Sequence, residues 1–434
     1  MRSDLETRLR DRLGGEDYLV PDYGSYCFGH VPDTVQTLLD ADVEGERPLS
    51  ADVLSGVGTV DSSDATPLDD RYDRVLVVVL DGFGLEPWTR FDHPLLERFE
   101  DSGTVTPLTS IYPSETAAAL TTFHTGRLPA SHGVLGWDVY DPADDAAYEA
   151  FSTRVRAGDD AVEYDLEEIF EGEPIYPKLV ECGVDCRHVV PFEETYDGAA
   201  CHTYGNPDGP VHGLEGFESA LAEAFAAADD PAYLFAYVPE IDTIAHAYGT
   251  SSEEYDEAVS DSLSALERGL ARLETEDEHG DTLLVLTADH GHVDTDPERN
   301  VDLETVDGVT EALERHADGE PVRYAGSPRN LHLHLHDPDE RREAVHETLL
   351  DTLDAKVFTR EEVLDRNLFG DGEESDTFHR RLGDLVVCHR ELSVWYGSDP
   401  TKLELIGMHG GLHPDEMLVP FAAVELEELS RELS

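Results

Sequence analysis

An unbroken apolar run, Val75–Leu80, ends at Asp81-Gly82. A run of this length, rich in valine and closed by a turn dipeptide, predicts a strand that is buried on both faces. In open α/β sheets, ligands bind at the carboxyl ends of the parallel strands. Asp81 is therefore predicted to place a carboxylate, which is a hard oxygen ligand for divalent cations, at that edge of a sheet.

Two further apolar runs end in the same way. The segment PAYLFAYV precedes Asp242, and DTLLVLT precedes Asp289-His290. Asp242 and His246 are four residues apart, so on a helix both side chains would lie on one face. Three distant segments are thus expected to bring a carboxylate to one edge of the sheet, and two of them bring a histidine as well. Aspartate and histidine together are a plausible ligand set for two divalent ions that bridge a phosphate.

A hydroxyl group is expected beside these ligands. The sequence Pro113-Ser114-Glu115-Thr116 is typical of a turn, the following residues up to Thr125 have helical composition, and Gly126 is a plausible C-cap. Thr116 would then lie at the N-terminus of a helix, where free backbone N–H groups and the positive end of the helix dipole favour an anion.

The alternation of predicted strands and helices favours a mostly parallel sheet. We expect an α/β fold, a three-layer α/β/α sandwich with an inserted smaller α+β subdomain. The predicted division is an N-terminal extension packing on the core (1–70), a catalytic core (71–304), the inserted subdomain (305–400) and a return to the core (401–434). Within the subdomain, His332–His336 alternate histidine with leucine. A solvent-facing strand is favoured there over a metal-binding tract.

Charge narrows the class of partner. The 434 residues include 96 acidic and 30 basic residues, giving a formal net charge of −66. Acidic residues spread along the whole chain, with only three lysines, are typical of a protein from a salt-saturated cytoplasm, where carboxylates keep the surface hydrated. The same charge argues against binding a nucleic-acid backbone. It leaves a small anionic substrate open, because bound metal ions can reverse the local field.

The cysteines and the apolar segments of the chain indicate its cellular compartment. The five cysteines are an odd number without a CxxC pair, which favours reduced thiols. The N-terminal segment is charged and no stretch has the length of a membrane-spanning helix, so we expect neither a signal peptide nor a membrane partner. The prediction is a cytoplasmic protein.

The order of these blocks resembles the alkaline phosphatase superfamily, and within it the type I phosphodiesterase/nucleotide pyrophosphatase family. The matching blocks are VVVLDGFG, YPSETAAALTTFHTGRLPASHGV, PEIDTIAHAYG, TADHGH and the late MHGG. They cover roughly residues 72–295 and 405–421, and the ordered set is highly specific.

The resemblance implies a role for each matched residue. Thr116 would be the nucleophile that forms a phosphothreonine. One metal ion would be held by Asp242, His246 and His409. The other would be held by Asp81, Asp289, His290 and the Thr116 hydroxyl. Two zinc ions are expected, with manganese as the alternative.

The implied activity is metal-dependent hydrolysis of a phosphodiester or nucleotide pyrophosphate. A phosphomonoesterase or phosphonate hydrolase of the same superfamily stays open, as does a metal-stabilised binding protein without turnover. Two positions depart from the family pattern, because Trp137 and Ala119 stand where the family carries asparagines. His413 is expected at the surface, and His292 either behind the metal ligands or exposed. His124 and His132 are expected to serve structure.

Overall fold

The computed structural model describes residues 2–12, 18–57, 67–152, 154–158, 169–191, 213–273 and 281–431. Its main sheet, which has six strands, follows the order β2-β17-β8-β1-β7-β6. The central strand β1 (Arg74–Leu80) is buried along its whole length, as the apolar run predicts. It pairs in parallel with β7 (Ala232–Val238) and β8 (Thr282–Thr287). The remaining strands are β2 (Thr104–Thr109), β6 (Asp185–Val189) and β17 (Leu418–Glu425).

The register of the sheet aligns the strand ends that carry the predicted ligands. Leu80 pairs with Val238, and Val79 pairs with Thr287, so β1, β7 and β8 end at the same level. Strand β17 runs antiparallel between β2 and β8. An antiparallel strand begins at the edge where its parallel neighbours end, so the loop before β17 also reaches this edge.

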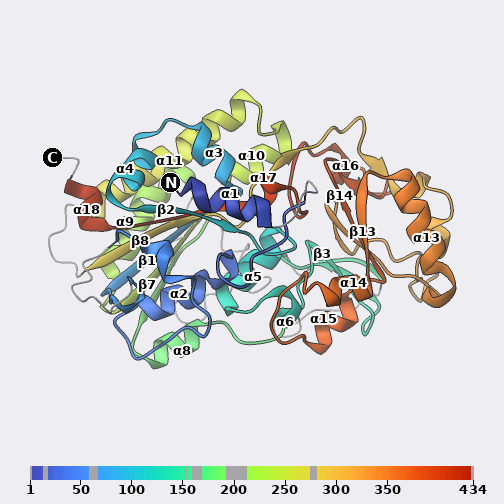
Figure 1. The fold of residues 1–434 in the computed structure, drawn as a ribbon, viewed down its shortest axis with the longest axis horizontal. Coiled ribbons are helices and arrows are strands. Elements are labelled where there is room, and N and C mark those ends of the chain that lie inside the picture. The colour runs from blue at the N-terminus through green and yellow to red at the C-terminus, as the bar shows by residue number, and fades with distance from the viewer. Residues whose placement is uncertain are drawn as a thin grey trace.

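Helices cover both faces of this sheet and complete the predicted three-layer sandwich (Figure 1). Above the sheet in that view lie α4 (Pro94–Ser102), α10 (Glu240–Tyr248) and α11 (Glu253–Leu273). Below it lie α2 (Val31–Leu38), α5 (Thr116–Thr125) and α8 (Tyr176–Glu181). Helix α11 shows why such helices form, because its apolar residues recur at helical spacing and are buried. They include Tyr255, Val259, Leu263, Leu266 and Leu270.

A second sheet follows the order β13-β14-β12-β11-β3-β4-β5 and lies to the right in Figure 1. Four of its strands come from the later part of the chain, namely β11 (Gly326–Ser327), β12 (Asn330–Leu333), β13 (Ala355–Thr359) and β14 (Leu385–His389). The other three are β3 (Asp138–Asp141), β4 (Ala146–Glu149) and β5 (Val155–Gly158). A small apolar core that includes Leu333, Leu349 and Trp395 lies against this sheet.

The expectation of a solvent-facing histidine strand is wrong. His332 and His334 are only 2% and 8% exposed. His332 contacts the ring of Phe369, and His334 contacts the ring of Tyr140. Burial of both rings lowers their pKa, to about 3 for His332 and about 4 for His334. These histidines therefore serve as packing residues inside the second sheet region.

The described N-terminal residues share the main core. Leu5, Leu9, Phe28, Val35 and Leu38 belong to the same buried apolar cluster as strand β1. Phe28 stacks on Phe123 of α5 with ring centroids 5.8 Å apart. Within the described ranges, every helix is too short or too polar to cross a bilayer.

Candidate metal centre and active site

All seven residues that the sequence singled out converge at the carboxyl edge of the six-stranded main sheet. Asp81 follows β1, Asp289 and His290 follow β8, and Thr116 is the first residue of α5. Asp242 and His246 lie on the first and last turns of α10, so the predicted i, i+4 pair is on one helix. His409 comes from the loop that leads to β17. The aligned strand ends explain why segments more than 300 residues apart meet here.

One group of ligand-competent atoms surrounds His290, and we refer to it as the Asp81 centre. His290 Nε2 lies 3.3 Å from Asp81 Oδ1 and 3.4 Å from Asp289 Oδ2. Thr116 Oγ1 lies 3.0 Å from the same nitrogen. All four side chains are at least 95% buried. The nucleophile candidate is thus in direct contact with a potential metal-binding group.

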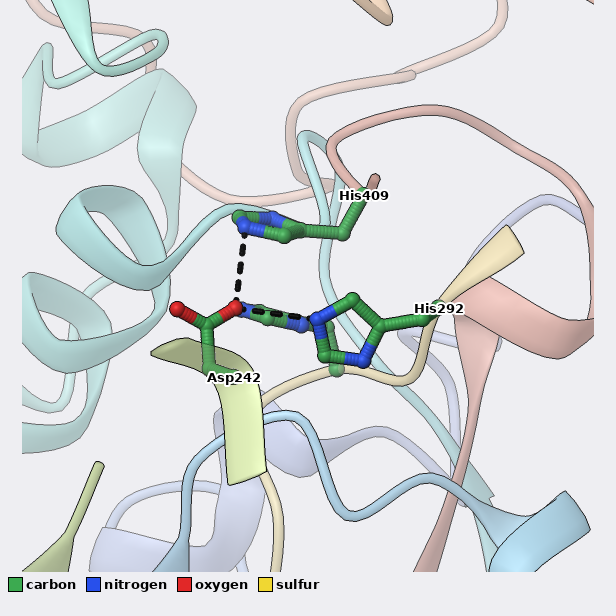
Figure 2. A group of neighbouring side chains, drawn as sticks. Asp242, His292 and His409 are labelled. Carbon is green, nitrogen blue, oxygen red and sulfur yellow. Dashed lines mark hydrogen bonds and ion pairs between the residues drawn. The ribbon is translucent and has the colours of Figure 1, made fainter. Parts of the chain in front are cut away.

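A second group of ligand-competent atoms comes from Asp242, His290, His292 and His409, so His290 is shared with the Asp81 centre. The nitrogens of His292, His409 and the neighbouring His246 lie around one carboxylate oxygen, and we refer to Asp242 with these three histidines as the Asp242 centre (Figure 2). Asp242 Oδ1 lies 3.4 Å from His246 Nε2, 3.4 Å from His409 Nε2 and 3.0 Å from His292 Nε2. The Nε2 atoms of His246 and His409 are 3.3 Å apart. Two atoms bound to one tetrahedral zinc ion lie roughly 3.3–3.4 Å apart, so these spacings fit a shared cation.

Backbone carbonyls fix the orientation of the three predicted histidine ligands. Nδ1 of His246 lies 2.7 Å from the Gly407 carbonyl, Nδ1 of His409 lies 3.1 Å from that of Ser114, and Nδ1 of His290 lies 3.1 Å from that of Gly291. A carbonyl oxygen can only accept, so each Nδ1–H donates. Each Nε2 lone pair is therefore directed into the cluster, which is the arrangement that metal-binding histidines adopt.

Burial and neighbouring charges shift the pKa values of several groups at the two centres. Burial, reinforced by Asp289 and Asp242, raises the pKa of Asp81 well above its ordinary value. Burial alone would also raise the pKa of Asp242, but His246, His292 and His409 hold it well below its ordinary value. Burial lowers the pKa of His409, and His290 lowers it further.

Two buried carboxylate oxygens of the site are suited to binding a cation. Asp81 Oδ1 and Asp289 Oδ2 accept no hydrogen bond from any described residue. A buried carboxylate oxygen without a donor is costly, because the charge has lost its water. Divalent cations at the two centres would satisfy these oxygens, and the mixture of aspartate and histidine ligands suits zinc.

The remaining residues singled out by the sequence lie outside these contacts. His124 and His132 are buried in the core and contact Tyr176 and Thr122. His413 is half-buried rather than at the surface, and its Nδ1 accepts the Asp415 backbone N–H at 3.2 Å, capping α17 (Pro414–Met417).

The two positions where the family carries asparagine have different environments. Trp137 is half-buried and stacks on Phe151 with ring centroids 5.6 Å apart. Ala119 is fully buried in α5 and has no side-chain donor. A phosphate-binding amide is therefore absent from both positions.

Sequence reasoning missed several residues that hold the site. The Tyr237 hydroxyl donates to Asp81 Oδ2, and its position near the end of β7 could have indicated this. Glu416 accepts hydrogen bonds from the backbone of Gly411 and His413 and is paired with the buried Arg329, which fixes the loop carrying His409. A glutamate three residues after the cap of a short helix was the available sequence signal.

Glu115, which precedes the nucleophile candidate, was also missed. Its side chain is 4% exposed, and its Oε1 lies 3.9 Å from His409 Nδ1. Burial raises the pKa of Glu115 to about 8. The site thus contains one more acidic group than the sequence pattern named.

Comparison with known proteins assigns the arrangement to a family. The sequence model of the Type I phosphodiesterase / nucleotide pyrophosphatase family matches residues 75–412, which include every residue of both centres. The chain belongs to this family. This match confirms the family membership that the order of the sequence motifs predicted.

Individual members of the family are distant. An uncharacterised pyrophosphatase/phosphodiesterase of Schizosaccharomyces pombe is 26% identical over 250 residues, covering 56% of this chain and 50% of that protein. Venom phosphodiesterase 2 of Crotalus adamanteus is 25% identical over 255 residues, covering 53% of this chain and 28% of that enzyme. The match thus spans about half the length of the yeast protein and less of the venom enzyme.

Solved structures of the family share the fold. Murine ectonucleotide pyrophosphatase / phosphodiesterase 5 aligns with a TM-score of 0.62 at 19% identity, covering 81% of this chain and 87% of that one. An inactive variant of the same murine protein in complex with AMP aligns equally well. The human protein aligns with a TM-score of 0.60 at 18% identity. The predicted three-layer α/β fold is confirmed.

Proposed function

We propose that this protein is a two-metal hydrolase of phosphodiester or nucleotide pyrophosphate bonds and that Thr116 is its nucleophile. The observation that carries the proposal is the contact between Thr116 Oγ1 and His290 Nε2, at the N-terminus of α5 and within the Asp81 centre. A site that only stores a metal ion needs no hydroxyl at its centre. Family membership and the AMP complex of the murine relative support a small, anionic phosphate-ester substrate.

The chain supplies binding and covalent catalysis. Backbone N–H groups at the start of α5 are positioned to bind phosphate oxygens. Thr116 Oγ1 gives up its proton and forms a bond to phosphorus while the bond to the leaving oxygen breaks and that oxygen takes up a proton, giving a phosphothreonine that keeps the other ester group. Water then attacks phosphorus and loses a proton, the Oγ1–P bond breaks, Oγ1 regains a proton, and the product leaves as a phosphate monoester.

Divalent cations would be held by the Asp81 and Asp242 centres. When bound, they would lower the pKa of the hydroxyl and neutralise the charge of the phosphate. Zinc suits these ligands, and manganese is the alternative. The acidic chain fits a salt-rich cytoplasm, and the free thiols among the described cysteines, Cys27, Cys182, Cys186 and Cys388, support a reducing compartment.

Monoester hydrolysis is the second candidate, and Trp137 and Ala119 favour it. Neither side chain is an amide, so the donor that the family pattern directs at a diester oxygen is missing. Parallel assays of bis-(p-nitrophenyl) phosphate and p-nitrophenyl phosphate, in molar KCl with zinc or manganese, separate the two activities.

The test of the nucleophile uses the matched pair Thr116→Ala and Thr116→Ser. Loss of the hydroxyl is expected to lower kcat by on the order of 10³-fold or more, whereas serine retains a hydroxyl and much of the rate. Quenched reactions of the wild type with the diester are expected to contain a chain heavier by one phosphoryl group together with the p-nitrophenyl ester group that it retains. Unchanged turnover in Thr116→Ala contradicts the proposal, and so does metal binding without hydrolysis of either substrate.

A further inference from the structure

His292 lies in the cluster without an assigned role. It is two residues beyond His290, and its side chain is fully buried. Its ring packs directly on Gly82, where an added Cβ would lie 2.2 Å from His292 Cε1. Gly82 follows Asp81, and the other side of the ring faces Asp242 (Figure 2).

Both polar neighbours of the His292 ring are hydrogen-bond acceptors. Nδ1 lies 3.2 Å from the Gly82 carbonyl, and Nε2 lies 3.0 Å from Asp242 Oδ1. Because the carbonyl can only accept, Nδ1 carries the proton of the neutral ring. The Nε2 lone pair then faces a carboxylate oxygen at 3.0 Å. Two facing lone pairs repel each other unless a cation binds both atoms or the ring gains a second proton.

The neighbouring histidines favour the shared cation. His246 and His409 have the same construction, with Nδ1 donating to a backbone carbonyl and Nε2 directed at the same Asp242 Oδ1. His292 repeats both features, and its Nε2 is nearer to that oxygen than either of the other two.

We propose that His292 Nε2 is a fourth protein ligand at the Asp242 centre, beside Asp242, His246 and His409. The proposal rests on the metal dependence proposed above. A set of one aspartate and three histidines fills the four positions of a tetrahedral ion. The Asp81 centre instead includes the exchangeable Thr116 hydroxyl. The ion at the Asp242 centre is therefore expected to be the more resistant of the two to chelators.

The test compares His292→Phe with His316→Phe. Phenylalanine keeps a ring against Gly82 and removes both ring nitrogens, the proposed ligand Nε2 and the Nδ1 that donates to the Gly82 carbonyl. His316 is a matched control, because it is also buried and its Nδ1 contacts a carboxylate, Asp145 Oδ1, at 2.8 Å. Its neighbour Tyr140 belongs to the second sheet. Retained metal is counted by elemental mass spectrometry after dialysis against a chelator, and the cobalt(II) form is followed by its visible absorption.

Loss of a ligand is expected to lower the affinity of His292→Phe for one of its two metal ions by more than about 100-fold. It should also change the absorption spectrum of the cobalt(II) form. His316→Phe should match the wild type in both measurements. A wild-type cobalt spectrum in His292→Phe overturns the proposal, even with weaker binding, because His292 would then only hydrogen-bond to Asp242.

X-ray absorption of wild-type protein loaded with one zinc ion per chain gives a readout that needs no variant to fold. Three imidazoles around that ion support the proposal, and two overturn it. Neither measurement uses turnover. If the wild type binds the ions with three imidazoles but hydrolyses no phosphate ester, the proposed function fails while the ligand assignment stands.

Discussion

Glu416 is not a predicted metal ligand, but it holds the loop that carries one. It and Arg329 are both fully buried and paired, with Arg329 Nε 3.2 Å from Glu416 Oε2. The same carboxylate holds the backbone of Gly411 and His413, just beyond His409. The geometry of the last histidine ligand thus depends on a buried ion pair.

Glu416→Gln is therefore expected to lower the free energy of unfolding by about 3–5 kcal/mol, because Arg329 keeps a buried charge without its partner. Urea unfolding in molar KCl measures the loss. The control Arg10→Gln removes an exposed pair with Glu6 and should change stability by no more than about 0.5 kcal/mol. Equal effects of the two substitutions would show that the buried pair contributes nothing special.

His188 makes the core sensitive to acid. Both of its ring nitrogens lack a hydrogen bond from the described residues, and the ring packs on Tyr176 and Phe235. Burial lowers its pKa to about 3. Below about pH 6.5, His188 is therefore protonated in the unfolded chain but stays neutral in the folded chain until the pH approaches 3. Its contribution to the free energy of unfolding is complete above about pH 6.5 and falls as the pH drops toward 3.

His188→Phe is expected to remove this dependence. The wild type should lose about 1.4 kcal/mol of unfolding free energy per pH unit through this residue below its unfolded pKa. Urea unfolding at about pH 7.5 and about pH 5 gives the two slopes. Parallel slopes for the variant and the wild type would mean that His188 is protonated in the folded state.

At the scale of elements, two glycines end segments that build the site. Gly126 closes α5 at φ 67°, and Gly82 follows Asp81 at φ 72°. A Cβ at Gly126 would make only ordinary contacts, the nearest at 3.6 Å, whereas a Cβ at Gly82 would collide with His292. The same left-handed backbone therefore has different surroundings at the two positions.

Alanine at either glycine is expected to cost about 1 kcal/mol of stability from the backbone alone. Only Gly82→Ala should also lower metal retention and turnover, because its Cβ displaces the His292 ring. Unfolding midpoints and elemental analysis measure the two effects. Full metal retention in Gly82→Ala would contradict the close packing of this ring.

The elements that the sequence predicted well are those with strong local patterns. The apolar run before Asp81 gave β1 almost to the residue, and Gly126 marked the end of α5. Local patterns could not foresee that β3–β5 join strands that follow some 170 residues later, because β-pairing depends on distant partners. They also misplaced His332 and His334, since a histidine that packs on aromatic rings has the same alternation as an exposed one.

At the candidate site, motif order predicted the seven residues that converge, because strand ends fix their place in the fold. The contact between His292 and Asp242 could not be predicted from the sequence. Its burial and its contact with Asp242 depend on how Gly82 packs across the sheet edge.

At the scale of the molecule, a net charge of −66 opposes compaction. Salt shortens the range of repulsion from about 10 Å at 0.1 M to about 3 Å at 1 M. Raising KCl over this range is expected to increase the thermal midpoint by on the order of 10 °C. Sucrose is the control, because it stabilises folded proteins without screening charge. A response to sucrose as large as the response to KCl would rule out charge repulsion as the main destabilising term.

The place of β17 has a consequence for how the protein is made. This strand lies between β2 and β8, although it comes more than 100 residues after either of them. During synthesis on the ribosome, β2 and β8 emerge before β17. The edge of each strand that later pairs with β17 stays without its hydrogen-bond partner until then. Until the segment Leu418–Glu425 leaves the exit tunnel, the sheet cannot close and the His409 loop has no anchor at its far end. The metal centres therefore assemble late in synthesis. The nascent chain is most prone to aggregation while the edges of β2 and β8 are unpaired.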